Sequence, residues 1–90
     1  MDLEKIFSSR TQTRILKHFL ENPNRIFNQA GLARFLDCSP STVARLLDPF
    51  IKEGIIMFEQ IGGQMKVIAL NVESEKVQAL LEFYRRIRDL

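Results

Sequence analysis

The stretch SPSTVARLLDPFIKEG, residues 39–54, decides how the rest of the chain is read. It predicts a capped helix, because the Ser39 hydroxyl can accept a hydrogen bond from the free N–H groups of a first helical turn. Pro40 follows at the first helical position, where its missing N–H costs nothing and its fixed φ suits the turn. Gly54 is typical of the residue just beyond a helix end. The sequence therefore predicts a helix over residues 39–53.

The two faces of this predicted helix differ in chemistry. The apolar residues recur at helical spacing on one side: Val43, Leu47 and Phe50, with Ile51 at its edge. The opposite side is small, polar and partly basic: Ser41, Arg45, Asp48 and Lys52, with Thr42 beside it. Such a helix can pack by its apolar back and enter a groove by its polar front.

Pro49 conflicts with a regular helix. It lies four residues after Arg45, whose carbonyl loses its helical partner and meets the proline ring. A proline in a helix interior costs about 3 kcal/mol. We therefore expect the helix to kink or to break into two pieces at Asp48, and nothing in the sequence explains why a proline stands there.

A second short helix is predicted directly upstream. Asn28 is a suitable N-cap for a helix over residues 29–36. Its apolar stripe is formed by Leu32, Ala33 and Leu36. Only Asp37 and Cys38 separate the end of this helix from the cap at Ser39. Two short helices joined this tightly predict a helix-turn-helix, in which the second is the recognition helix.

After Gly54 the apolar period changes from helical to two, which predicts a β-hairpin. A two-residue turn at Gly62-Gly63 pairs Phe58 with Val67, Glu59 with Lys66 and Gln60 with Met65. The predicted core face is then Ile56, Phe58, Met65, Val67 and Ala69. The other face exposes Met57, Ile61 and Ile68, so we expect it to contact the C-terminal helix or a second chain.

These elements together resemble a known family. The run QAGLARFLDCSPSTVARLL, followed by KEGII and a Gly-Gly hairpin, resembles the winged helix-turn-helix domains of prokaryotic transcription regulators, of the MarR-like and ArsR-like sort. The resemblance covers roughly residues 9–71. It implies a mainly α fold with a small β-hairpin wing (α+β), in which a three-helix core carries the wing and a C-terminal helix. It also implies that residues 25–27 form a short extended piece that pairs with the base of the wing.

The segments outside the helix-turn-helix complete the predicted organisation. Ser9 to Gln12 fits a capping box that starts a helix reaching about Asn22. That helix is expected to bury Ile15, Leu16, Phe19 and Leu20. Residues 1–8 are expected to be an N-terminal arm, with Leu3, Ile6 and Phe7 available for docking. Residues 9–71 are the DNA-binding domain, and residues 72–90 a C-terminal dimerisation helix capped by Ser74.

The family resemblance implies a sequence-specific regulator that binds double-stranded DNA, with helix 39–53 in the major groove and wing 55–70 near the minor groove. Arg45 can read guanine, and Ser41 or Thr42 can bond bases or phosphates. The predicted DNA-binding residues are Arg34, Ser39, Ser41, Thr42, Arg45, Lys52, Gln60, Gln64 and Lys66. Because the wing has Lys66 as its one cation and Asp48 lies on the groove face, we expect modest affinity per subunit.

A homodimer is predicted from the apolar surface of the C-terminal helix, whose stripe is too wide for one docking edge. The predicted dimerisation residues are Val77, Leu80, Leu81, Phe83, Tyr84 and Ile87. The alternative is that this helix folds back onto the first helix of its own chain and that the protein is monomeric.

Composition is consistent with this interpretation. Ninety residues make one domain, and a net charge of +2 permits nucleic acid as a partner. No transmembrane window or signal pattern occurs, and a single cysteine forms no internal disulfide, so we expect a cytoplasmic protein. His18 and Cys38 lack the neighbours that catalysis or metal binding requires, and the paired-cysteine motif of ArsR-like metal sensors is missing. We therefore expect no enzyme, metal or cofactor, and Cys38 is interpreted as structural.

One alternative function stays open alongside DNA binding. The same fold can serve as a protein-interaction module, using the apolar wing face and the last helix. An enzyme is a more distant alternative and would require a pocket converging on His18 or Cys38. The sequence does not identify any effector ligand.

Overall fold

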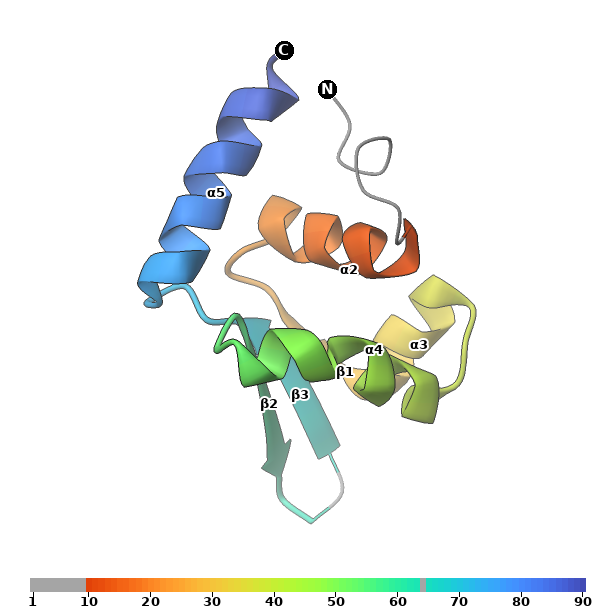
Figure 1. The fold of residues 1–90 in the computed structure, drawn as a ribbon. Coiled ribbons are helices and arrows are strands. Elements are labelled where there is room, and N and C mark those ends of the chain that lie inside the picture. The colour runs from red at the N-terminus through yellow and green to blue at the C-terminus, as the bar shows by residue number, and fades with distance from the viewer. Residues whose placement is uncertain (1–9, 64) are drawn as a thin grey trace.

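The computed structural model describes residues 10–63 and 65–90, and it confirms a winged-helix architecture. Figure 1 shows the wing projecting from a group of helices, on the side away from the C-terminus. The elements are α2 (Arg10–Glu21), β1 (Ile26–Asn28), α3 (Gln29–Leu36), α4 (Pro40–Lys52), β2 (Ile56–Ile61), β3 (Met65–Leu70) and α5 (Glu75–Arg88). The predicted arm and the Ser9 side of the capping box lie outside the described residues.

The helix-turn-helix forms as its capping residues predict. The Asn28 side chain accepts a 2.6 Å hydrogen bond from the Gly31 N–H at the start of α3. Asp37 ends α3 in the left-handed conformation, with φ of 56°. Ser39 then caps α4, its hydroxyl accepting from the Thr42 N–H at 3.2 Å. The chain thus turns between α3 and α4 in three residues, which fixes the two helices against each other.

Helix α4 runs unbroken from Pro40 to Lys52, so of the two expected outcomes, a kink or a break at Asp48, the break does not occur. Pro49 lies inside it. A proline removes a single hydrogen bond, because its missing N–H would have bonded Arg45, and the helix resumes beyond it with the Glu53 N–H donating to the Pro49 carbonyl at 3.2 Å. Val43 and Leu47 are completely buried, so packing of the apolar face holds the helix together across the proline.

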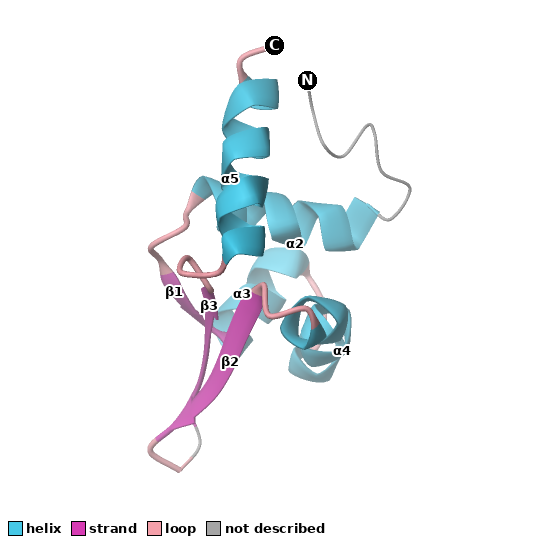
Figure 2. Cartoon of the chain, turned by 60° about the vertical axis from the view of Figure 1, so that its left-hand side comes forward, coloured by secondary structure: helices cyan, strands magenta, loops and turns pink. Residues whose placement is uncertain are grey.

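A three-stranded antiparallel sheet has the order β1-β3-β2. Residues 25–27 were expected to pair with the base of the wing, and the strand Ile26–Asn28 does pair with β3. Phe27 faces Ile68 in this pairing, and both side chains are buried. Figure 2 shows β2 and β3 extending well beyond the helices, so the far half of the wing stands free.

The predicted register of the wing is wrong by one residue. Phe58 pairs with Ile68, Glu59 with Val67 and Gln60 with Lys66. Ile61 pairs with Met65, so three residues of the sequence rather than two separate the paired ends of β2 and β3. Gly62 and Gly63 both have positive φ, 49° and 65°, which glycine adopts without steric cost.

This register changes which side chains face the core, because neighbouring residues of a strand point to opposite sides. The buried side consists of Ile56, Ile68 and Leu70, with Phe58 half-buried beside them. Ile68 was expected outside and is fully buried. Met65 was expected in the core and is 59% exposed. The outer face nevertheless stays apolar, and α5 does not cover it: Ile26, Met57, Ile61 and Met65 are all exposed.

Helix α5 contributes to the core of its own chain. Val77, Leu81, Tyr84 and Ile87 are buried, and the helix contacts α2. Burial, and after it the nearby Glu21 carboxylate on α2, raises the pKa of Tyr84. Ser74 occupies the N-cap position, but its side chain makes no capping hydrogen bond; its backbone carbonyl accepts from Gln78 instead. None of the helices in the described part of the chain is long and apolar enough to span a membrane.

Candidate nucleic-acid interface

The start of α4 carries a cluster of hydroxyl groups. The Ser39 Oγ lies 3.1 Å from the Ser41 Oγ and 2.8 Å from the Thr42 Oγ1. A guanidinium N–H of Arg45 donates to the Thr42 Oγ1 at 3.5 Å. The structure therefore brings four of the predicted DNA-binding residues together on one exposed face. Ser39 and Thr42 are already committed to internal hydrogen bonds, whereas the remaining donors of Arg45 point to no partner among the described residues.

A contact that the sequence analysis missed holds this face in position. The Gln29 side-chain amide, at the start of α3, donates a 2.7 Å hydrogen bond to the Pro40 carbonyl at the start of α4. The side chain of Gln12 on α2 donates similarly to the Leu46 carbonyl at 3.3 Å. Neither contact with α4 had a signal in the sequence, because a glutamine on a helix surface has no preferred tertiary partner until the helices are packed.

Asp48 and Lys52 form an ion pair along the exposed side of α4, with a 2.8 Å separation between Nζ and Oδ2. The hydrogen bond to Asp48, and then its charge, raises the pKa of Lys52. The Asp48 carboxylate on the exposed side of α4 is therefore neutralised by Lys52 of the same helix. An exposed pair of this kind is weak and exchanges readily, so Lys52 can leave Asp48 for a phosphate.

Arg34 and Lys66 lie on the walls of one groove between α3 and the wing. The groove has a volume of about 550 Å³ and is lined by Asn28, Gln29, Ala30, Arg34, Met65 and Lys66. Two cations from distant parts of the sequence are thus brought to the same hollow. This arrangement suits the anionic backbone of a nucleic acid, because phosphate contacts in such interfaces come mainly from arginine and lysine.

The tip of the wing contributes less than expected. The Gln60 side chain donates to the Gly63 carbonyl across the turn, so its amide is turned toward the wing itself. Gln64 lies outside the described residues. Ile61 and Met65 face each other near the tip, both exposed. Lys66 is consequently the main polar candidate of the wing.

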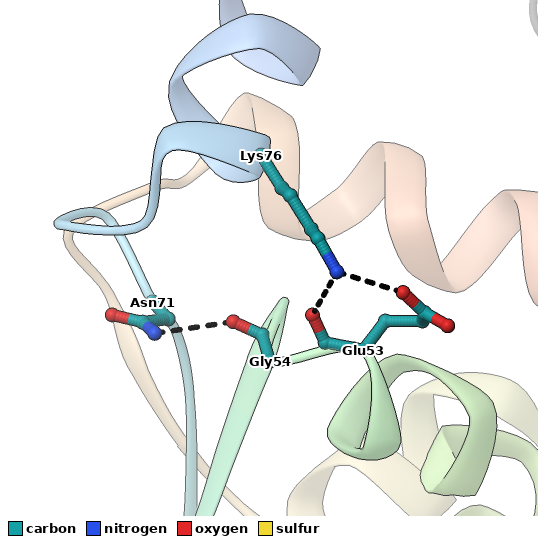
Figure 3. Close-up of polar contacts among 4 residues, drawn as sticks. All are labelled: Glu53, Gly54, Asn71 and Lys76. Carbon is teal, nitrogen blue, oxygen red and sulfur yellow. Dashed lines mark hydrogen bonds and ion pairs between the residues drawn. The ribbon is translucent and has the colours of Figure 1, made fainter.

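The end of α4 is tied to the start of α5 by polar contacts, shown in Figure 3. The Lys76 ammonium donates to the Glu53 carbonyl at 3.3 Å and forms a 2.8 Å ion pair with its carboxylate. This pairing lowers the pKa of Glu53. The Asn71 side chain donates to the Gly54 carbonyl at 3.1 Å. A lysine near the last carbonyls of a helix is favourable to the helix dipole, so these contacts stabilise the end of α4.

The predicted dimerisation residues separate into two groups. Four of the six, Val77, Leu81, Tyr84 and Ile87, are buried in the core of their own chain. The reason is that α5 folds back onto α2, the alternative considered above. Leu80 is half-buried, and Phe83 is 47% exposed. These two residues are the part of the predicted set that another chain can still reach.

Two further residues named from the sequence have defined places. Cys38 is half-buried at the edge of the core, next to the turn of the helix-turn-helix. His18 is half-buried on α2 and stacks on Phe35, with ring centroids 4.2 Å apart. Within residues 10–63 and 65–90, no group of three His, Cys, Asp or Glu side chains is placed to hold a metal ion.

Comparison with known proteins gives one family and two similar structures. The family model for the MarR family matches residues 8–62, more than half of the chain. A possible transcriptional regulator from Methanosarcina mazei superposes with a TM-score of 0.65 at 17% identity, over 90% of this chain and 70% of that one. MepR, a transcription regulator of the multidrug efflux pump MepA of Staphylococcus aureus, superposes with a TM-score of 0.65 at 20% identity. That match covers 97% of this chain and 65% of MepR. No curated protein matches the sequence.

Proposed function

The chain belongs to the MarR family, and from this we propose that it is a transcription regulator that binds double-stranded DNA sequence-specifically. In the proposed complex α4 lies in the major groove and the β2–β3 wing lies near the minor groove. The observation that supports this most strongly is the exposed face at the start of α4. There a buried apolar back holds Ser41 and Arg45 outward, on the half of a recognition helix that meets base edges.

The roles of the individual side chains follow from their surroundings. Arg45 is proposed to read a base, since its guanidinium extends from the exposed face and can form two hydrogen bonds to guanine. Arg34 and Lys66 are proposed to contact phosphates from the two walls of their groove. Ser39 and Thr42 are proposed to orient the start of α4 and the Arg45 side chain, because their hydroxyls are already engaged there.

Salt dependence of binding tests the proposal. Duplexes selected from genomic DNA are titrated with the protein at several salt concentrations, and fluorescence polarisation reports the affinity. The logarithm of the binding constant should fall with the logarithm of salt concentration by about 0.9 for each phosphate neutralised. Lys66→Ala should reduce this slope by about one and weaken all sequences alike. The matched control is Arg85→Ala, an exposed cation on α5 away from α4 and the wing. No salt-dependent binding by the parent protein would remove the proposal.

We also propose that two chains associate through α5, so that two weak DNA contacts act together. Leu80 and Phe83 are the proposed contact residues, because they are the members of the predicted set that remain accessible. Residues 9–71 would then be the DNA-binding part, residues 72–90 would carry both core and dimer contacts, and residues 1–8 remain a proposed arm. Both similar structures are longer than this chain, which covers 70% of the first and 65% of the second.

A second candidate function is supported by the outer face of the sheet. Ile26, Met57, Ile61 and Met65 are exposed large apolar residues on one side of the three strands. A protein-interaction module would use such a surface and bind DNA only incidentally. Met57→Glu discriminates between the two functions: it should leave DNA affinity unchanged for a DNA-binding regulator, and abolish partner binding for an interaction module.

A further inference from the structure

The tip of the wing carries no charge. Residues 60–65 read QIGGQM, and none of them is ionisable. The Gln60 side chain donates to the Gly63 carbonyl, so its amide closes the turn instead of reaching outward. Attraction to phosphates requires arginine or lysine, which this tip lacks. The tip therefore needs another kind of contact if it is to meet DNA.

Two large apolar side chains stand at the tip. Ile61 and Met65 are directly opposite each other in the register of β2 and β3, on either side of the turn. They are 53% and 59% exposed. Residues directly opposite in an antiparallel pair point to the same face, with Cβ atoms about 4.5–5.5 Å apart. Ile61 and Met65 therefore form one apolar surface at the end of the hairpin, and we call them the tip pair.

A second exposed apolar pair, Ile26 and Met57, lies on the same face of the sheet at the base of the wing. Both are opposite Ala69 in the register, Ile26 from β1 and Met57 from β2. Three strands lie side by side at this level, whereas Figure 2 shows that only β2 and β3 reach the tip. The tip pair can therefore enter a narrow opening, and the base pair cannot.

The tip pair borders the candidate nucleic-acid interface. Met65 lines the groove that Arg34 and Lys66 share. Gln29 lines the same groove and donates to the Pro40 carbonyl at the start of α4. The apolar tip is thus continuous with the surface that we propose for DNA. Lys66 follows Met65 in the sequence, so it can hold a phosphate while the tip pair reaches the bases.

The minor groove limits how such a tip can bind. In a straight duplex this groove is about 6 Å wide, which is narrow for a hairpin end with two large side chains abreast. Proteins that meet the minor groove through apolar side chains insert them between base pairs, and isoleucine and methionine are among the residues that do so. The base step then partly unstacks and the duplex kinks. Burial of the apolar side chains against the bases offsets this cost.

We propose that the tip pair is an apolar wedge that enters the minor groove and partly unstacks one base step. This inference rests on the proposed function and makes it more specific. The preferred DNA has a flexible pyrimidine–purine step, TA or CA, where the wing lies. Glu59 limits how far the wedge enters, because it follows Ile61 toward the base of the wing on the same face and phosphates repel its carboxylate.

The test uses 2-aminopurine, a fluorescent base whose emission is quenched by stacking. It replaces the adenine of a TA or CA step, in a series of the selected duplexes that moves this step along the flank of the site. Fluorescence polarisation of a separate end label reports binding. We expect emission to rise at saturation with the parent protein at one position of the series. Ile61→Ala combined with Met65→Ala should bind roughly tenfold more weakly and give no rise at saturation.

The matched control is Ile26→Ala combined with Met57→Ala, which removes the same two types of side chain from the base of the wing. It should keep both the affinity and the rise in emission. A duplex with an abasic site at the step gives a second measurement that needs no variant. The parent should bind it more tightly than the intact duplex, because a damaged step costs less to open.

The outcomes separate the wedge from the proposed function. Binding by the parent without a rise in emission at any position overturns the wedge and leaves the proposed function standing. A rise that the tip variant retains, equal losses in the two double variants, or no gain with the abasic duplex would each overturn it as well. DNA binding and emission that the tip variant leaves unchanged would assign the tip to a protein partner instead. No binding by the parent removes the proposed function, and the wedge with it.

Discussion

At the scale of single residues, the surroundings of Arg45 determine what its loss should do. Its guanidinium lies 3.5 Å from the Thr42 hydroxyl on the exposed face of α4 and has no other partner among residues 10–63 and 65–90. Removing it therefore leaves the fold intact and takes away a potential base contact. The exposed arginines of α5 carry the same charge as Arg45 but lie elsewhere in the fold. A variant of one of them therefore controls for the loss of charge alone.

We expect Arg45→Ala to cost about 1–3 kcal/mol in DNA binding and to relax the preference at one base pair, because a bidentate contact to guanine carries this discrimination. The measurement is competition titration with duplexes that differ at single positions. Arg86→Ala, which removes an exposed cation from α5, is the control. A uniform loss over all sequences would assign Arg45 to the phosphate backbone instead.

His18 predicts a pH dependence of stability. Burial, and next the charge of Arg25, lowers its pKa below the ordinary value of 6.5; Glu21 opposes this and Arg14 adds to it. The unfolded chain therefore takes up a proton at a higher pH than the folded chain, so stability is full above the ordinary pKa and is lost as the pH falls through the folded one.

We expect denaturant unfolding to show stability that begins to fall as the pH drops below about 7, before ordinary carboxylates titrate. His18→Gln should flatten this dependence, because the chain has a single histidine. The variant loses the ring stacking on Phe35, so its absolute stability does not test the prediction. The slope of the free energy of unfolding against pH does. Parallel slopes for both proteins would contradict the prediction.

At the scale of elements, the start of α4 depends on a single cap. Ser39→Ala removes the acceptor of the Thr42 N–H, and we expect a loss of about 0.5–2 kcal/mol in the free energy of unfolding. Ser41→Ala is the control: its hydroxyl contacts Ser39 but caps nothing, and surface changes of this kind stay within about 0.5 kcal/mol. Chemical denaturation monitored by circular dichroism measures both. Equal losses would show that the hydroxyl cluster, rather than the cap, stabilises the helix.

The helix-turn-helix and the wing differ in how far their structure could be predicted from the sequence. The helix-turn-helix was predictable because caps at Asn28 and Ser39 and apolar spacing are local signals. The register of the wing was not predictable, because the sequence at Gly62-Gly63 is compatible with a turn of two residues or of three. A shift of one residue in the register moves every side chain of a strand to the opposite face of the sheet. The effect of Pro49 was not predictable, because the cost of a proline in a helix can be read from the sequence alone. The burial of Val43 and Leu47, which offsets that cost, comes from tertiary packing.

The candidate site was predictable to a similar extent. Arg45 and Ser41 are exposed on α4 as their helical positions require. The meeting of Arg34 and Lys66 in one groove was not predicted, because it joins two residues that are distant in the sequence. The contacts that orient α4, from Gln29 at its start and Lys76 at its end, exist only once distant helices pack together.

At the scale of the whole molecule, the burial of α5 changes how dimerisation is tested. Removing the helix would expose the core around Val77 and Leu81, so a truncated chain would report folding and not association. A substitution at an exposed position of α5 tests association without disturbing folding. Phe83 is the best such position, as it is the most exposed of the predicted contact residues.

We expect Phe83→Glu to raise the dimer dissociation constant at least roughly tenfold, because it places a charge where an apolar side chain should be buried. Sedimentation equilibrium measures it. Gln78→Glu is the control, since it adds the same charge at an exposed position of α5 that faces away from Phe83. A parent protein that is monomeric at micromolar concentration would remove the dimer proposal, as would a variant that associates unchanged.

The strand order β1-β3-β2 has a consequence for how the protein is made. Phe27 pairs with Ile68, so β1 leaves the ribosome long before its partner strand exists. At roughly 5–20 residues per second, the nascent chain waits on the order of seconds with this strand edge open. Helix α2 emerges before β1, helices α3 and α4 emerge during this interval, and the last core side chains arrive with α5. Nascent chains stalled before β3 should therefore stay sensitive to protease and recruit chaperones, until translation supplies the strand that closes the sheet.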